Sequence, residues 1–148
     1  MTRLNASLVG IVALTLVAGS ESVQGQCVIF EDPADMFRTA DAVFVGTVRR
    51  TEPTGALGHH IVMHRASFEI EQVWKGQVKK FETVGTVEAF DPGKRYLVFA
   101  GASEESRGRE GSFQTSLECG WAQIESDAAR NLRWLRGNVG SPLRVRDN

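Results

Sequence analysis

The sequence predicts a mainly β fold, with five strands in one small domain, a short helix before them and a second helix after them. Five segments rich in β-branched and aromatic residues alternate with turns that contain glycine or proline. Two further segments, one on each side of these strands, repeat their apolar residues at helical spacing. The length of 148 residues suits a single domain, and the chain has no internal repeats.

The first residues have the layout of a secretory signal peptide. Arg3 supplies the positive charge, and residues 8–18 form an uncharged, mostly apolar run. A membrane-spanning helix needs roughly 20 such residues, so we expect no integral membrane segment after cleavage. Cleavage after Ser20 or after Gly25 fits the small-residue rule, and the second is favoured. We therefore expect a leader over residues 1–25, a domain over 26–137 and a flexible tail over 138–148.

Both helices are expected from their cap residues and apolar stripes. The first lies within residues 30–40, where Asp32 is a suitable N-cap and is followed by a proline. The second lies over residues 126–136, with Ser126 as its N-cap and Gly137 as its C-terminal stop.

The strands are expected over residues 42–50, 60–74, 78–87, 96–100 and 113–117. The first and fourth are apolar on both faces, which predicts that they are central. Gly46 indicates a bend or bulge in the first strand, and a break in the alternation indicates a bulge near Gln72 in the second. Residues 51–58 contain a proline and two glycines and predict a loop. Five short strands with such turns predict an OB-like Greek-key barrel.

The charge balance excludes some partners. The chain has 17 Lys+Arg and 18 Asp+Glu, a formal net charge of -1. Nucleic-acid binders carry a basic face and a high isoelectric point, so we expect no nucleic acid as a partner.

The three histidines do not fit one metal site. On a strand His60 and His64 share a face but lie about 13 Å apart, whereas His59 points to the opposite face. A zinc ion needs every donor atom about 2 Å away. We therefore expect solvated histidines and no bound metal.

No pattern supports catalysis. Glu69 and Glu71 alternate with apolar residues, which favours the outward face of a strand over a pair of catalytic acids. Ser103, Ser112 and Ser116 lack the glycines of a nucleophile elbow, and no phosphate-binding glycine motif occurs. The sequence thus predicts a protein that is not an enzyme and needs no cofactor.

Large aromatic residues favour burial over an exposed binding role. Each indole carries a large apolar area, so we expect Trp74, Trp121 and Trp134 to lie in the core or at its edge.

Cys27 and Cys119 are the only cysteines. They are too few for a four-cysteine zinc site. An even cysteine count in a secreted domain predicts that they form a disulfide. The loop it closes spans 119 − 27 = 92 residues, which in the chain-entropy model is worth about 4.5 kcal/mol.

Several segments carry a resemblance when they are read in order: ADAVFVGTV, FEIEQVWKG, PGKRYLVFA, TSLECG and DAARNLRWLRG. With the signal peptide and the early cysteine, they resemble bacterial secreted proteins that have a tissue-inhibitor-of-metalloproteinases-like (netrin-module-like) OB-fold. The resemblance covers residues 27–137. It implies a five-stranded OB barrel with a C-terminal helix. It also implies a disulfide between the N-terminal segment and the end of the fifth strand, which matches Cys27 and Cys119.

The chain departs from true tissue inhibitors at the first disulfide. Their mature chain begins Cys-x-Cys, and the first cysteine chelates the zinc of the protease. Here Cys27 matches the second cysteine, Gly25 stands at the place of the first, and no cysteine lies between Trp74 and Tyr96 to pair with it. After cleavage at Gly25 the new N-terminal Gln26 can cyclise and lose its amine. The resemblance therefore supports the fold more than inhibition.

Three functions compete. The first is a secreted, extracellular or periplasmic, non-enzymatic OB-fold monomer that binds a protein or an envelope component. The alternative is a metalloproteinase inhibitor that acts through its N-terminal segment and loops. The third is binding of single-stranded nucleic acid or oligosaccharide on the barrel face, and the near-neutral charge argues against the nucleic acid.

Overall fold

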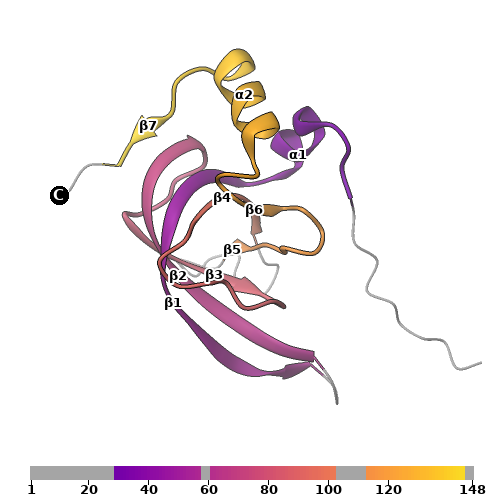
Figure 1. Cartoon of the computed structure of the whole chain (residues 1–148), viewed down its shortest axis with the longest axis vertical. Helices are drawn as coiled ribbons and strands as arrows, with labels where there is room; N and C mark the ends of the chain where they lie inside the picture. The colour runs from indigo at the N-terminus through magenta and orange to yellow at the C-terminus, as the bar shows by residue number, and fades with distance from the viewer. Residues whose placement is uncertain (1–28, 58–60, 103–112, 146–148) are drawn as a thin grey trace, which may run out of the picture.

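The computed structural model of the protein describes residues 29–57, 61–102 and 113–145 (Figure 1). The predicted leader lies outside these ranges, as do Cys27, His59, His60, Ser103 and Ser112. The elements in chain order are α1 (Pro33–Thr39), β1 (Ala42–Leu57), β2 (Ile61–Lys75), β3 (Phe81–Thr86), β4 (Arg95–Ala102), β5 (Phe113–Gln114), β6 (Ala122–Ile124), α2 (Ala129–Asn138) and β7 (Leu143–Arg144).

The strands form one sheet that closes on itself as a ring. β1 pairs antiparallel with both β2 and β4, and β2 pairs antiparallel with β3. β3 pairs parallel with β5, which pairs antiparallel with β4 and so completes the ring. The short strands β6 and β7 add to β4 and β2 respectively. The predicted mainly β fold with two helices is confirmed, and β6 and β7 are additions to the predicted set.

Two apolar clusters hold the fold together. The first fills the ring, and Phe68 lies at its centre, in edge-to-face contact with Phe44, Phe90 and Tyr96. The second lies between the outer face of β1 and β4 and the two helices, where Val45 and Phe99 pack with Leu135 and other apolar residues. Burial of this apolar area is the main force that stabilises the fold.

The central position of β1 and β4 is confirmed. Val43, Phe44 and Val45 are each 0% exposed, because successive side chains enter the two clusters alternately. Leu97 and Val98 of β4 alternate in the same way. A strand covered on both faces has no polar face, which is why these segments are continuous apolar runs.

The predicted bulges are also confirmed. The pairing of β1 with β2 shifts register between Val45 and Gly46, where the partners change from Gln72 to Ile70. A Cβ at Gly46 would lie 2.8 Å from the backbone oxygen of Glu69. Gly46 therefore allows a close approach of two strands that no other residue would permit without a shift.

The prediction of a loop over residues 51–58 is wrong for residues 51–57. Residues 51–57 continue β1 and pair with the start of β2, forming a ribbon that extends away from the ring (Figure 1). Pro53 lies on this exposed ribbon beside a register shift, and a strand tolerates a proline in such a place. The turn residues thus mark an irregular strand and not its end.

The first helix agrees with its prediction, and the second differs at both ends. In α1 the Asp32 carboxylate accepts from the Ala34 N–H at 2.8 Å, and a proline occupies the first turn. In α2 the predicted cap is wrong, because Ser126 Oγ donates to Asp127 Oδ1 in a turn that precedes the helix. Ala128 takes the N-cap position without any side-chain bond and is buried in the second cluster. Packing therefore decides where α2 begins.

The predicted stop at Gly137 is wrong as well. α2 runs through Gly137, and Gly140 ends it, with φ of 109° and an N–H that donates to the Leu135 carbonyl at 3.0 Å. A residue with positive φ is the usual end of a helix. The segment that follows includes β7, which pairs with Gln72 and Val73 of β2 within the range expected as a flexible tail.

The fifth strand is shorter than predicted, because it covers Phe113–Gln114 only. Beyond Gln114, Thr115 is still bonded to the neighbouring strands, since its N–H donates to the Gly85 carbonyl of β3 at 3.0 Å and its Oγ1 to the Phe99 carbonyl of β4 at 2.9 Å. Ser116 Oγ donates instead to the Glu88 carboxylate. Among the residues that the model describes, no helix has the length and apolar character needed to cross a membrane.

Candidate functional site

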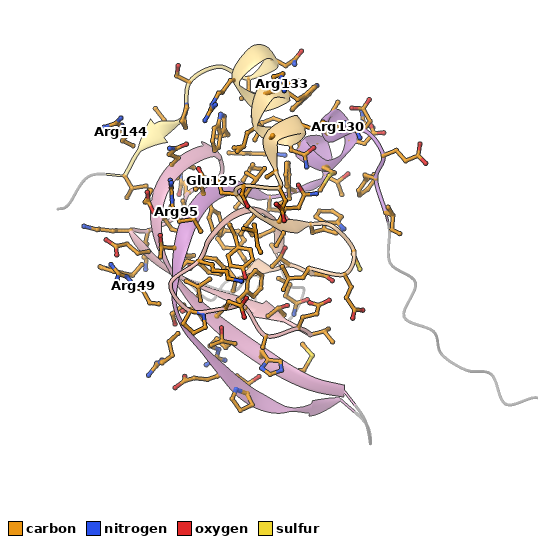
Figure 2. All side chains as sticks on the ribbon, in the orientation of Figure 1. Arg49, Arg95, Glu125, Arg130, Arg133 and Arg144 are labelled. Atoms are coloured by element: carbon orange, nitrogen blue, oxygen red, sulfur yellow. The ribbon has the colours of Figure 1, made fainter. Side chains whose placement is uncertain are left out.

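The first described residues are fixed against the body of the protein. The Phe30 ring meets Trp121 edge-to-face at 5.3 Å, and the Glu31 carbonyl accepts from the Arg130 guanidinium at 2.7 Å. Arg130 lies on the side of α2 that faces α1 (Figure 2). Ile29, by contrast, is 69% exposed. The segment therefore carries an exposed apolar side chain on an anchored backbone.

A cavity of about 280 Å³ lies beside this segment. Its walls come from the N-terminal segment, α1, the turn before β6 and the start of α2: Ile29, Phe30, Glu31, Met36, Cys119, Gly120, Gln123, Asp127, Arg130 and Asn131. We call this set the N-terminal corner. Asn131 is only 7% exposed and donates from Nδ2 to Gln123 Oε1 at 3.1 Å. The corner thus combines apolar side chains with a partly buried amide–amide hydrogen bond, and small concave binding sites have such mixed walls.

The turn that carries Cys119 is held by the carboxylate of Glu88. Ser116 Oγ donates to Glu88 Oε1 at 2.7 Å, and Thr86 Oγ1 donates to Oε2 at 2.8 Å. The backbone N–H groups of Leu117 and Glu118 also donate to this carboxylate, each at 3.2 Å. Glu88 thereby joins the end of β3 to a turn about 30 residues further along the chain.

The Glu88 carboxylate is stabilised in its charged form. Its partial burial raises the pKa, but the hydrogen bonds from Ser116, Thr86 and the backbone N–H groups of the turn outweigh that effect. The net result is a pKa below the usual value of 4.5. Hydrogen bonds to a carboxylate favour its ionised form in this way.

Cys119 lies at the edge of the corner and is half-buried. Its N–H donates to Ser116 Oγ at 3.2 Å, so the Glu88 contacts also fix the backbone of Cys119. Cys27 lies outside the described residues, and the Cys27–Cys119 disulfide stays a prediction. The position of Ile29 beside Cys119 in the same cavity wall is compatible with that bridge.

Glu69 and Glu71 take part in a surface ion-pair network, away from the corner. Glu69 pairs with Arg49 and Lys80, while Glu71 accepts from Thr47 Oγ1 at 2.8 Å and pairs with Arg95 at 3.0 Å. Arg95 also pairs with Glu125 at 2.7 Å, and the two lie side by side in Figure 2. The predicted position of Glu69 and Glu71 on the outward face of the strand is confirmed, because the alternating residues Phe68 and Ile70 point into the ring.

The described members of the other candidate sets are dispersed. His64 lies on β2 opposite Thr86 and is half-buried with its Nδ1 away from solvent, so the expectation of a solvated histidine is wrong for His64. The described residues include no cluster of His, Cys, Asp or Glu that could hold a metal ion. Ser116 Oγ donates to Glu88, and within the described residues it has no hydrogen bond with a histidine that could activate it as a nucleophile. All three tryptophans are half-buried against the second cluster, as predicted.

Sequence reasoning did not identify Glu88, Gln123, Arg130 or Asn131. Glu88 follows a strand and resembles any surface glutamate, because its donors come from a turn that is distant in sequence. Asn131 interrupts the apolar stripe of α2, and a polar residue at a buried helical position is a signal that could have been used.

A scan against models of known protein families finds no match, and neither does a search of curated protein sequences.

Proposed function

We propose that the chain is a secreted, non-enzymatic binding module with an OB-like Greek-key barrel, and that its N-terminal corner binds a protein partner. The barrel is supported by the strand order, in which β1, β2, β3, β5 and β4 follow one another around the ring and only β3 and β5 are parallel. A closed five-stranded sheet is the arrangement that OB-folds use.

One observation carries the binding role: Ile29 is 69% exposed on a backbone that is already fixed next to a cavity. Phe30 and Glu31 hold this backbone through Trp121 and Arg130. A segment ordered before binding loses little conformational entropy when a partner docks. Apolar anchors beside a pocket provide most of the affinity in protein interfaces. A partner side chain would enter the cavity while Ile29 packs on the partner's surface.

The corner also favours a protein partner over a small charged ligand. Its described charged residues are of both signs: Arg130 lines the cavity together with Glu31 and Asp127. Charged residues of both signs beside the apolar side chains of Ile29, Phe30 and Met36 match the mixed composition of protein interfaces.

The experiment is site-specific photo-crosslinking in the cells that export the protein. A photoreactive side chain at position 29 should yield one discrete cross-linked product, whereas the same side chain at Val87, which is 46% exposed elsewhere, should not. The partner identified from position 29 is then purified. I29D should weaken its affinity at least tenfold, and V87D should leave it unchanged. Absence of a product at position 29, or equal affinity of I29D and the wild type, would contradict the proposal.

A metalloproteinase inhibitor is the second candidate, and the same corner favours it. The exposed Ile29 lies two residues after Cys27, close to the N-terminal segment with which tissue inhibitors chelate the zinc of the protease. Titration of the exported protein against a panel of zinc proteases tests it. Inhibition that I29D abolishes would identify the partner class, and no inhibition by micromolar protein would eliminate this candidate.

A further inference from the structure

The end of the molecule formed by α2 and β7 carries a concentration of positive charge. Residues 129–145 contain four of the 17 basic residues and no Asp or Glu, so the rest of the chain is net acidic. In Figure 1, α2 and β7 lie at the opposite end of the long axis from the tip of the β1–β2 ribbon. The formal net charge of -1 is therefore the sum of a basic segment over residues 129–145 and a net acidic remainder of the chain.

The arginines of this end are available to a partner. Arg133, Arg136 and Arg144 are exposed, and within the described residues their guanidinium groups make no ion pair or hydrogen bond. Arg144 lines a hollow together with Glu69, Glu71 and Lys80, whereas Arg133 and Arg136 do not line it. Arg130 differs, because it donates to the Glu31 carbonyl. Figure 2 labels Arg133 on α2 and Arg144 on β7, both at this end.

Exposed apolar side chains occur in the same segment. Val139, just after α2, is 39% exposed, and Leu143 in β7 is 76% exposed. We call the set Arg133, Arg136, Val139, Leu143 and Arg144 the basic end. Leu143 pairs with Val73 through β7, so its backbone is held in the sheet while its side chain points into solvent.

We propose that the basic end binds the surface of a bilayer that contains anionic phospholipids. Lipid phosphates would pair with the three arginines, and Leu143 and Val139 would enter the boundary between the headgroups and the acyl chains. Interfacial binding by soluble proteins combines these two contributions, electrostatic attraction and a small buried apolar area. An acidic protein or free phosphate would use the arginines but would leave the exposed leucine unexplained.

The expected affinity is moderate and depends on salt. Each basic residue near an anionic bilayer contributes about 1 kcal/mol, or roughly fivefold in partition coefficient. Binding should weaken as ionic strength rises, because salt screens the attraction between exposed charges. The inference is independent of the proposed protein-binding role, since no residue of the basic end lines the N-terminal corner.

Co-sedimentation of the exported protein with vesicles tests the proposal. The vesicles contain phosphatidylcholine alone or an equimolar mixture with phosphatidylglycerol. We expect the wild type to bind the mixed vesicles and not the neutral ones. R133Q/R136Q should lower the partition coefficient about 25-fold at low salt. The matched control is R50Q/R65Q, which removes the same charge from exposed positions on the ribbon. This control should lower the partition coefficient less than twofold.

The apolar contribution has its own variant. L143S leaves the charge unchanged and should lower the partition coefficient a fewfold, because it removes the exposed side chain that would enter the bilayer. Three results would overturn the proposal: no binding to the mixed vesicles, equal binding to both kinds of vesicle, or equal losses in R133Q/R136Q and R50Q/R65Q. A circular-dichroism spectrum identical to that of the wild type establishes that each variant is folded.

Discussion

Glu88, beside the Cys119 turn, and Glu71, on the outer face of β2, are both half-buried carboxylates, yet different groups hold them. Glu88 accepts from two hydroxyl groups and two backbone N–H groups, whereas Glu71 accepts from Thr47 and pairs with the long side chain of Arg95. Backbone and hydroxyl donors are placed by the fold itself, while an exposed ion pair must restrain a flexible side chain. Glu88 therefore fixes a backbone path, and Glu71 joins side chains that already lie on a formed sheet.

The largest expected effect comes from the predicted disulfide, the second tether of the turn that Glu88 holds. C27S/C119S should lower the free energy of unfolding by about 4 kcal/mol. The bridge would close a loop of 92 residues (119 − 27) and so reduce the conformational entropy of the unfolded chain. Urea unfolding followed by tryptophan fluorescence measures the loss. Reduction of the wild type should give the same value. An unfolding curve that neither change alters would mean that the turn has no such tether.

The second effect separates the two carboxylates directly. E88Q should lower the free energy of unfolding by about 1–2 kcal/mol, because an amide cannot accept all four hydrogen bonds and leaves donors of the turn unsatisfied. E118Q makes the same change of charge at the neighbouring exposed Glu118 and should cost less than about 0.5 kcal/mol. Equal losses for E88Q and E118Q would show that charge alone, and not the hydrogen-bonded turn, is responsible.

The pH dependence sharpens the same comparison. The pKa of Glu88 is lowered in the folded protein, so its stabilisation is complete above the unfolded value of 4.5 and is lost as the pH falls below it. The difference in unfolding free energy between the wild type and E88Q should therefore be constant from neutral pH to about pH 5 and shrink at lower pH. A difference that grows on acidification has the wrong sign for this account of Glu88.

The smallest effect is expected on the outer face. E71Q should lower the free energy of unfolding by about 0.5 kcal/mol, because Glu71 and Arg95 are each about 40% exposed and water competes for their charges. The loss should decrease in high salt, whereas that of E88Q should not. Denaturant unfolding of both variants at two salt concentrations checks this, and a loss for E71Q as large as that for E88Q would remove the distinction between the two regions.

The parts of the fold that were predictable are those in which one local pattern decides the structure. β1 and β4 are covered on both faces, and their unbroken apolar runs predicted this. The cap and proline of α1 act within one turn of the chain, so the sequence around Asp32 was sufficient. The bulge at Gly46 was also predictable, because a glycine inside a strand usually marks a bulge or a close approach of another backbone.

Tertiary contacts decided the parts that were not predictable. Phe81 is 64% exposed while Glu82 next to it is 5% exposed, and the carboxylate of Glu82 accepts from the N–H groups of Lys79 and Thr83. Residues 51–57 pair along β2 in spite of their turn residues. At the candidate site, cysteine counting directed attention to Cys119, whereas Glu88 and Asn131 depend on partners from other elements.

The N-terminal corner depends on residues 29–31 being fixed beside the Cys119 turn, since both the binding surface and the predicted tether require it. Intact mass spectrometry of the purified protein, alkylated with and without prior reduction, is the most direct test. We predict a monomer two hydrogen masses lighter than the reduced chain, with both cysteines alkylated only after reduction. Two cysteines that react without reduction would contradict a tethered corner.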